Sequence, residues 1–137
     1  MRFASREWIA AVAAALDAQP DLSRALAGLG KDAAFVVEAD GRAFPRAVAV
    51  HARQEKGRIA RWRILPDEDD ILEIEPDYVV RAPYGTWKAL LRGERDPVKA
   101  ALSGQVKVKG DLEALVRRSS YRHVIDAALA AVPTEFG

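Results

Sequence analysis

The sequence predicts a single α+β domain, in which a largely antiparallel sheet of about five strands has helices covering one face. Three observations predict this fold class. The chain has 137 residues, 50% of them hydrophobic, which suits one domain with one core. Apolar residues recur with helical spacing near both ends of the chain but alternate with polar residues in the middle, and such segregation is typical of α+β folds. No repeat or linker divides the chain, so residues 1–137 are expected to form one unit.

The first thirty residues predict two helices. Ser5 is placed to cap a helix that runs to about Asp17, and Glu7 lies in its first turn, where its charge opposes the helix dipole. A shorter helix begins after Pro20 and stops near Gly28. The apolar positions of these two helices are Trp8, Ile9, Val12, Leu16, Leu22, Leu26 and Leu29.

The middle of the chain predicts strands joined by turns. Asp40-Gly41 and Lys56-Gly57 are turn signals between segments of alternating apolar residues. An acidic loop, Pro66 to Asp70, follows the third strand. Two more short strands are expected after it, Ile71–Glu75 and Tyr78–Ala82. The alternating apolar positions of the first three strands are Phe35, Val37 and Ala39, then Val48 and Val50, then Ala60, Trp62 and Ile64.

The stretch from Tyr84 to Leu115 predicts two helices, a strand and the start of another helix. The first helix gathers its apolar residues on one face and ends at a glycine, and the second starts at an Asp-Pro pair that suits its first turn. A final helix follows, with Ser119-Ser120 interrupting or re-capping the chain. The residues that carry these features are, in order, Trp87, Leu90, Leu91, Gly93, Asp96-Pro97, Ser103-Gly104, Val106, Val108, Gly110-Asp111, Leu112, Leu115, Val116, Tyr121, Val124, Ile125, Ala128, Leu129 and Val132.

This order of elements resembles the sterol carrier protein-2 (sterol-transfer) family of lipid-binding domains. The residues that carry the resemblance are Tyr78 to Ala82, Trp87 to Gly93, Asp96-Pro97, Ser103-Gly104, Val106 to Lys109 and Gly110-Asp111. It implies an apolar tunnel between the sheet and the helices, with the last helix as a lid. It also implies non-catalytic binding, and transfer or presentation, of a fatty-acyl, isoprenoid or sterol-like ligand.

The resemblance assigns roles to apolar residues that periodicity alone would assign to an ordinary core. Trp87, Leu90 and Leu91 are expected to form one wall of the tunnel. Val106 and Val108 are expected to form part of its floor. The expected lid residues are Val124, Ile125, Ala128 and Leu129, whereas Trp8, Val12 and Leu16 are interpreted as second-layer core.

Two other functions stay open from the sequence. One is an accessory module that docks to a lipid-related biosynthetic enzyme. The other is an enzyme that uses His51 or the acidic run Asp67–Asp70, but His51 and His123 fall in separate elements and the run lacks the ligand spacing of a calcium loop. We therefore expect no catalytic residue, no metal and no cofactor.

Charge balance and composition limit the kinds of partner that the chain is expected to bind. Lys plus Arg number 21 against 20 for Asp plus Glu, so the net charge of +1 is too small to attract nucleic acid or an anionic membrane. A basic hairpin leaves contact with RNA or anionic lipid as an alternative, but pairing with the acidic loop is favoured. With no cysteine, no signal peptide and no apolar run near membrane-span length, we expect a cytoplasmic protein with at most transient membrane contact. The hairpin carries Arg53, Lys56, Arg58, Arg61 and Arg63.

Overall fold

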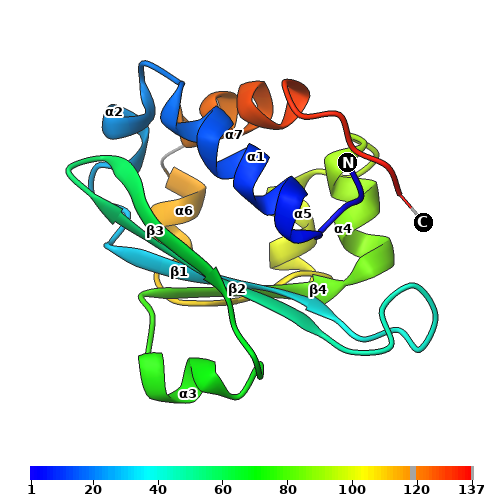
Figure 1. Ribbon diagram of the computed structural model, residues 1–137. Helices are drawn as coiled ribbons and strands as arrows, with labels where there is room; N and C mark the ends of the chain where they lie inside the picture. The colour runs from blue at the N-terminus through cyan, green and yellow to red at the C-terminus, as the bar shows by residue number, and fades with distance from the viewer. Residues whose placement is uncertain (118–119, 137) are drawn as a thin grey trace.

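The structure, a computed structural model, describes residues 1–117 and 120–136 and consists of one sheet between two unequal layers of helices. In Figure 1 a group of helices lies above the sheet, while α3 alone lies below it. The strands are β1 (Asp32–Glu38), β2 (Val48–Glu55), β3 (Arg58–Ile64), β4 (Tyr78–Pro83) and β5 (Lys107–Lys109). The helices are α1 (Arg6–Asp17), α2 (Leu22–Leu26), α3 (Asp70–Ile74), α4 (Tyr84–Leu91), α5 (Pro97–Leu102), α6 (Leu112–Arg117) and α7 (Ser120–Ala130).

The sheet is largely antiparallel, as predicted. Within the described residues its five strands lie in the order β3-β2-β1-β4-β5, and every neighbouring pair is antiparallel except β1 and β4. The parallel pair arises because the chain leaves β3, crosses beneath the sheet through α3, and returns as β4 on the far side of β1 (Figure 1). β1 is therefore the central strand, and β3 and β5 are the edges.

The two faces of the sheet differ in what covers them. We call the face toward α1, α4 and α7 the inner face and the face toward α3 the outer face. On the outer face, side chains of β1, β2 and β4 form a closely packed cluster with α3. Its buried members are Ala34, Val36, Ala49, Leu65, Ile71 and Val79.

The prediction of a strand at Ile71–Glu75 is wrong, because this segment forms α3. Ile71 and Ile74, three residues apart, both pack against the outer face, while Leu72 between them is 73% exposed. Two apolar residues at that spacing share a helix face. Glu75 ends the helix in the left-handed conformation, with φ of 50°.

The connection between β1 and β2 is also longer than a tight hairpin. Its nine residues, 39–47, lie outside both strands and extend beyond the sheet in Figure 1. An Asp40 carboxylate oxygen accepts hydrogen bonds from the backbone N–H groups of Arg42 at 2.8 Å and Phe44 at 2.9 Å. Pro45 has no backbone N–H to contribute to strand pairing. The loop therefore organises around Asp40, and β2 begins only at Val48.

Helix ends predicted from capping residues agree with the structure. The Ser5 hydroxyl accepts from the Trp8 N–H at 3.2 Å, and Asp96 accepts from the N–H groups of Val98 and Lys99. Gly93 adopts a positive φ of 74° just after α4. The expected interruption at Ser119 lies outside the described residues.

Candidate functional site

A row of apolar side chains crosses the whole inner face. Pairing places one residue of each strand directly beside the next, and direct partners in neighbouring strands point to the same face. Val80 and Val108 pack against the same buried cluster as Trp87 and Leu90 of α4, which assigns the row to the inner face. From the β3 edge to the β5 edge the row consists of Ile64, Val50, Phe35, Val80 and Val108.

The centre of this row is accessible although helices cover it. Phe35 lies on the central strand, yet 41% of it is exposed, and the other four residues of the row are only half-buried. On the opposite side of the same strand, Ala34 and Val36 are 0% exposed under a single short helix. Exposure at a sheet centre cannot come from a strand edge. A large part of the Phe35 surface therefore has no protein atoms packed against it.

Trp87 joins the helices to the sheet beside this row. Its indole Nε1–H donates to the backbone oxygen of Val36 at 3.0 Å, so the one polar atom of the ring is satisfied. Trp87 also packs against two clusters, one containing the buried residues Ala82 and Val106 and the other containing Val37 and Tyr84. Trp87 therefore links α4 directly to β1.

The structure brings most of the predicted wall and floor together. Trp87, Leu90, Val106 and Val108 belong to one cluster, formed around the buried residues Ala82 and Ala100. Leu91 instead packs with Phe3 and Tyr84 in a second cluster at the end of α4.

The predicted lid residues lie apart from that wall. Val124 is buried with Leu22 and Ala25 of α2, and Ala128 is 0% exposed. Leu129 is half-buried and Ile125 is 37% exposed. α7 thus packs against α1 and α2, and its buried residues belong to the core.

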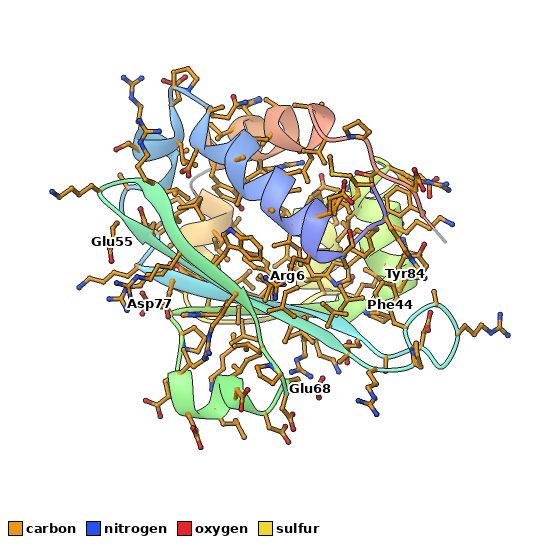
Figure 2. All side chains as sticks on the ribbon, in the orientation of Figure 1. Arg6, Phe44, Glu55, Glu68, Asp77 and Tyr84 are labelled. Atoms are coloured by element: carbon orange, nitrogen blue, oxygen red, sulfur yellow. The ribbon has the colours of Figure 1, made fainter. Side chains whose placement is uncertain are left out.

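Aromatic residues close one end of the inner face. Phe3 contacts the rings of Trp8, Phe44, Tyr84 and Phe136 at centroid distances between 5.0 and 6.1 Å. Figure 2 shows Phe44 and Tyr84 side by side at this end, where their centroids are 5.0 Å apart. Trp8, predicted as second-layer core, also donates from Nε1 to the Thr134 hydroxyl at 2.9 Å.

A cation lies beside the inner face near β3. The Arg6 guanidinium of α1 is 5.8 Å from the centroid of Trp62, and Figure 2 shows Arg6 between α1 and the sheet. Trp62 is two residues from Ile64, so the two side chains share a face. One charged group therefore stands close to the β3 end of the apolar row.

The polar groups that could support other chemistry lie elsewhere. His51 Nε2 and Asp32 Oδ2 are 2.8 Å apart on the outer face, whereas His123 is exposed on α7. Among the residues that the structure describes, no group of three or more His, Asp or Glu side chains could hold a metal ion. Across the same part of the chain, no helix is long and apolar enough to cross a membrane.

Sequence reasoning missed Phe35, Val50, Ile64 and Val80 as candidate site residues. Alternation did place Phe35, Val37, Val48 and Val50 on apolar faces. The missing information was register, because only the pairing of β1 with both β2 and β4 shows that Phe35 lies at the centre of the sheet.

Comparison with known structures supports the same architecture. A crystal structure of sterol carrier protein 2 is 23% identical, with a TM-score of 0.79 over 96% of this chain and 99% of that chain. A solution structure from Thermus thermophilus, described as possibly a sterol carrier protein, is 24% identical, with a TM-score of 0.75 over 93% and 88%. The UbiJ-SCP2 ubiquinone synthesis protein is 18% identical, with a TM-score of 0.51 over 87% and 85%. At these identities the likeness shows the fold.

The family itself follows from the sequence comparison. No curated protein matches the chain. The model of the SCP-2 sterol transfer family, however, matches residues 12–120, which is well over half of the chain. These residues include every strand of the sheet and all helices from α2 to α6. The protein belongs to the SCP-2 sterol transfer family.

Proposed function

We propose that the protein binds a hydrophobic small molecule between the inner face of the sheet and the helices, and carries or presents it without catalysis. The observation that supports this most strongly is the exposure of Phe35, which is 41% accessible at the centre of a covered apolar face. An unfilled apolar surface in that position is costly in water and becomes favourable when a ligand covers it. Membership in a sterol transfer family supports the same conclusion.

The binding energy comes from apolar surface. Each Å² removed from water contributes about 25 cal/mol, so a long acyl, isoprenoid or sterol-like molecule gains affinity from its length. Aliphatic walls distinguish poorly between ligands of similar shape, which predicts a broad ligand range. Apart from Arg6 near β3, the described inner face offers few polar groups, so most of the affinity comes from the apolar part of the ligand.

We assign the floor of the site to the apolar row and one wall to α4 and its neighbours. Phe35, Val80 and Val108 form the floor, and Trp87 and Leu90 form the wall, with Val106 supporting both. Leu91 supports α4 by packing against the cluster that contains Phe3 and Tyr84. α7 acts as a cover, in which the core residues Val124 and Ala128 position Ile125 and Leu129.

Native mass spectrometry of gently purified protein, followed by organic extraction, tests the proposal. A stoichiometric apolar adduct would support it and identify the chemical class of the ligand. A clean apo mass, together with no uptake of a fluorescent fatty acid, would contradict it. The fold would then be interpreted as an accessory module, and a pull-down with a lipid-related biosynthetic enzyme would be the next measurement.

A pair of matched variants places the ligand. Phe35→Trp adds aromatic bulk where the ligand is proposed to lie and should weaken fatty-acid uptake by roughly ten-fold, because it occupies that space. Leu72→Trp adds similar bulk on α3, at a position that is 73% exposed on the outer face, and should leave uptake unchanged. Equal effects of the two variants would place the ligand elsewhere.

A further inference from the structure

A hollow lies along β2 and β3 at the β3 edge of the sheet, and its basic residues are on the outer face. Its volume is about 610 Å³, and it opens between β2, β3 and α3. The residues around it are His51, Arg53, Ile59, Arg61, Trp62, Arg63 and Ile74. We call the four basic members, His51, Arg53, Arg61 and Arg63, the basic groove.

The basic groove is a two-by-two array set by strand register. His51 is the direct partner of Arg63, and Arg53 is the direct partner of Arg61. Along each strand the two positions are two residues apart, so all four side chains point to the same face, in rows about 7 Å apart. Basic residues directly opposite each other repel when both are charged, as the Arg53–Arg61 pair is, and such a pair destabilises a sheet.

Among the described residues, no carboxylate forms a direct ion pair with any of the three arginines, although the charge of Asp32 lies near Arg53. Asp32 is the cross-strand partner of Arg53, but its Oδ2 bonds His51 at 2.8 Å and its Oδ1 accepts from the Asp77 N–H at 2.9 Å. Burial alone would raise the pKa of Asp32, yet these two hydrogen bonds, together with the charges of His51 and Arg53, hold that pKa below its usual range. Within the described part of the chain, no ion pair joins Arg53, Arg61 or Arg63 to an acidic side chain. The expected pairing of the hairpin arginines with the acidic loop is therefore not found among these residues.

We propose that the basic groove binds a phosphate group carried by a small molecule, as a phosphomonoester or a diphosphate. The planar guanidinium fork donates two parallel hydrogen bonds to a phosphate, and three exposed arginines surround one hollow. A bound anion would also remove the repulsion within the array.

The surroundings favour a compact anion over an extended one. α3 and the loop before it lie on the same outer face, and Figure 2 shows Glu68 of that loop below the sheet. The segment carries Asp67, Glu68, Asp69, Asp70 and Glu73. A nucleic acid would extend beyond the hollow and meet these carboxylates, whereas one phosphate group inside the hollow would not.

A titration with inorganic diphosphate at constant ionic strength, followed by ¹H–¹⁵N correlation spectra, tests the proposal. Saturable shifts are expected at the amides of β2 and β3. The double variant Arg61→Gln/Arg63→Gln should lose roughly ten-fold or more in affinity. Its melting temperature should be unchanged or higher, because like charges have been removed, so lost binding would not reflect unfolding. Arg24→Gln, on α2 and outside the groove, should bind as the parent does.

Two further arms identify the source of the phosphate. Binding to phosphatidylcholine vesicles that contain phosphatidic acid, lost in the double variant and without binding of soluble diphosphate, would support the groove and assign it to a lipid head group. Binding of diphosphate without vesicle binding would support a soluble ligand. Shifts confined to residues outside the groove, or no variant-dependent binding to either probe, would overturn the proposal. Tighter, equally variant-dependent binding of an RNA oligonucleotide would replace it.

Discussion

Two neighbouring residues on β1 show how differently the two faces of the sheet are used. Val36 is 0% exposed on the outer face, whereas Phe35 is 41% exposed on the inner face. A fully buried side chain stabilises the fold through its packing. A partly exposed apolar side chain leaves part of its surface available to contact a ligand. Stability and ligand binding are thus assigned to adjacent positions of one strand.

Alanine substitutions at these positions should separate the two properties. Val36→Ala should lower the free energy of unfolding by about 2 kcal/mol, and Phe35→Ala should lower it by less than the roughly 3–5 kcal/mol of a buried phenylalanine. Phe35→Ala should nevertheless reduce ligand affinity, while Val36→Ala should retain it. Urea unfolding of the apo proteins and fluorescent fatty-acid titration measure the two effects. A loss of stability at Phe35 typical of a buried phenylalanine would show that the inner face is fully packed.

Arg6 is expected to add charge selectivity at the β3 end of the inner face. Its guanidinium, 5.8 Å from the Trp62 ring centroid, could meet the carboxylate of a fatty acid whose chain covers the apolar row. Arg6→Gln should weaken binding of a fatty acid several-fold but leave the matching fatty alcohol nearly unaffected, because only the acid is charged. Competition titrations with the two ligands measure the difference. Equal losses for acid and alcohol would assign Arg6 a packing role.

At the scale of elements, the turn between β2 and β3 fixes α2 to the sheet. Gly57 has φ of 74°, and a Cβ at this position would come within 2.6 Å of the Ser23 Cα on α2. Gly41 has the same φ of 74° but nothing within 4 Å of a Cβ. The two glycines share one backbone requirement and differ only in their neighbour.

Comparing alanine substitutions at the two glycines should show how much the close contact with α2 adds to the loss of stability. Gly41→Ala should cost about 1 kcal/mol, from the left-handed backbone alone. Gly57→Ala should cost at least about 1 kcal/mol more, because α2 must also move away from the turn. Thermal unfolding of the two variants compares them directly. A similar loss of stability in the two variants would mean that α2 can move away from the turn at little cost.

Local chemistry predicted most elements, while long-range pairing decided the rest. Ser5 and Asp96 are caps that act within three residues, so the starts of α1 and α5 were predictable. Ile71 and Ile74 form a helix because the outer face offers them a surface, and five residues carry too little periodicity to show it. The central position of Phe35 depends on β4 pairing in parallel with β1, where its direct partner is Val80, far along the chain.

For the molecule as a whole, two carboxylates that accept backbone hydrogen bonds, Asp40 and Asp96, predict that stability falls at low pH. Hydrogen bonds from the N–H groups of Phe44 and Arg42 lower the pKa of Asp40, and those from Lys99 and Val98 lower the pKa of Asp96. A lowered folded-state pKa stabilises the protein above the ordinary carboxyl value of about 3.9 and loses that contribution as pH falls through the folded value.

The melting temperature should therefore fall on acidification below about pH 4. Asp96→Asn keeps a capping oxygen but cannot titrate there, so its melting temperature should fall less steeply over the same range. Asp21→Asn is the control, since Asp21 makes no side-chain cap hydrogen bond on α2. Melting temperatures measured from about pH 6 to about pH 2 test both variants. The same pH dependence in the parent protein and both variants would show that protonation of Asp96 does not cause the loss of stability.

The two ends of the chain meet at one corner of the molecule. The Glu135 N–H donates to the Met1 carbonyl at 2.7 Å, the Phe3 N–H donates to the Glu135 carbonyl at 3.0 Å, and Figure 1 shows the segment after α7 running beside the N-terminus. A domain closed in this way can be spliced into a surface loop of another protein with little strain, since its entry and exit points already coincide. A circular permutant, with the ends joined by a short linker and new ends opened in the exposed loop at Gly41, should fold to the same sheet.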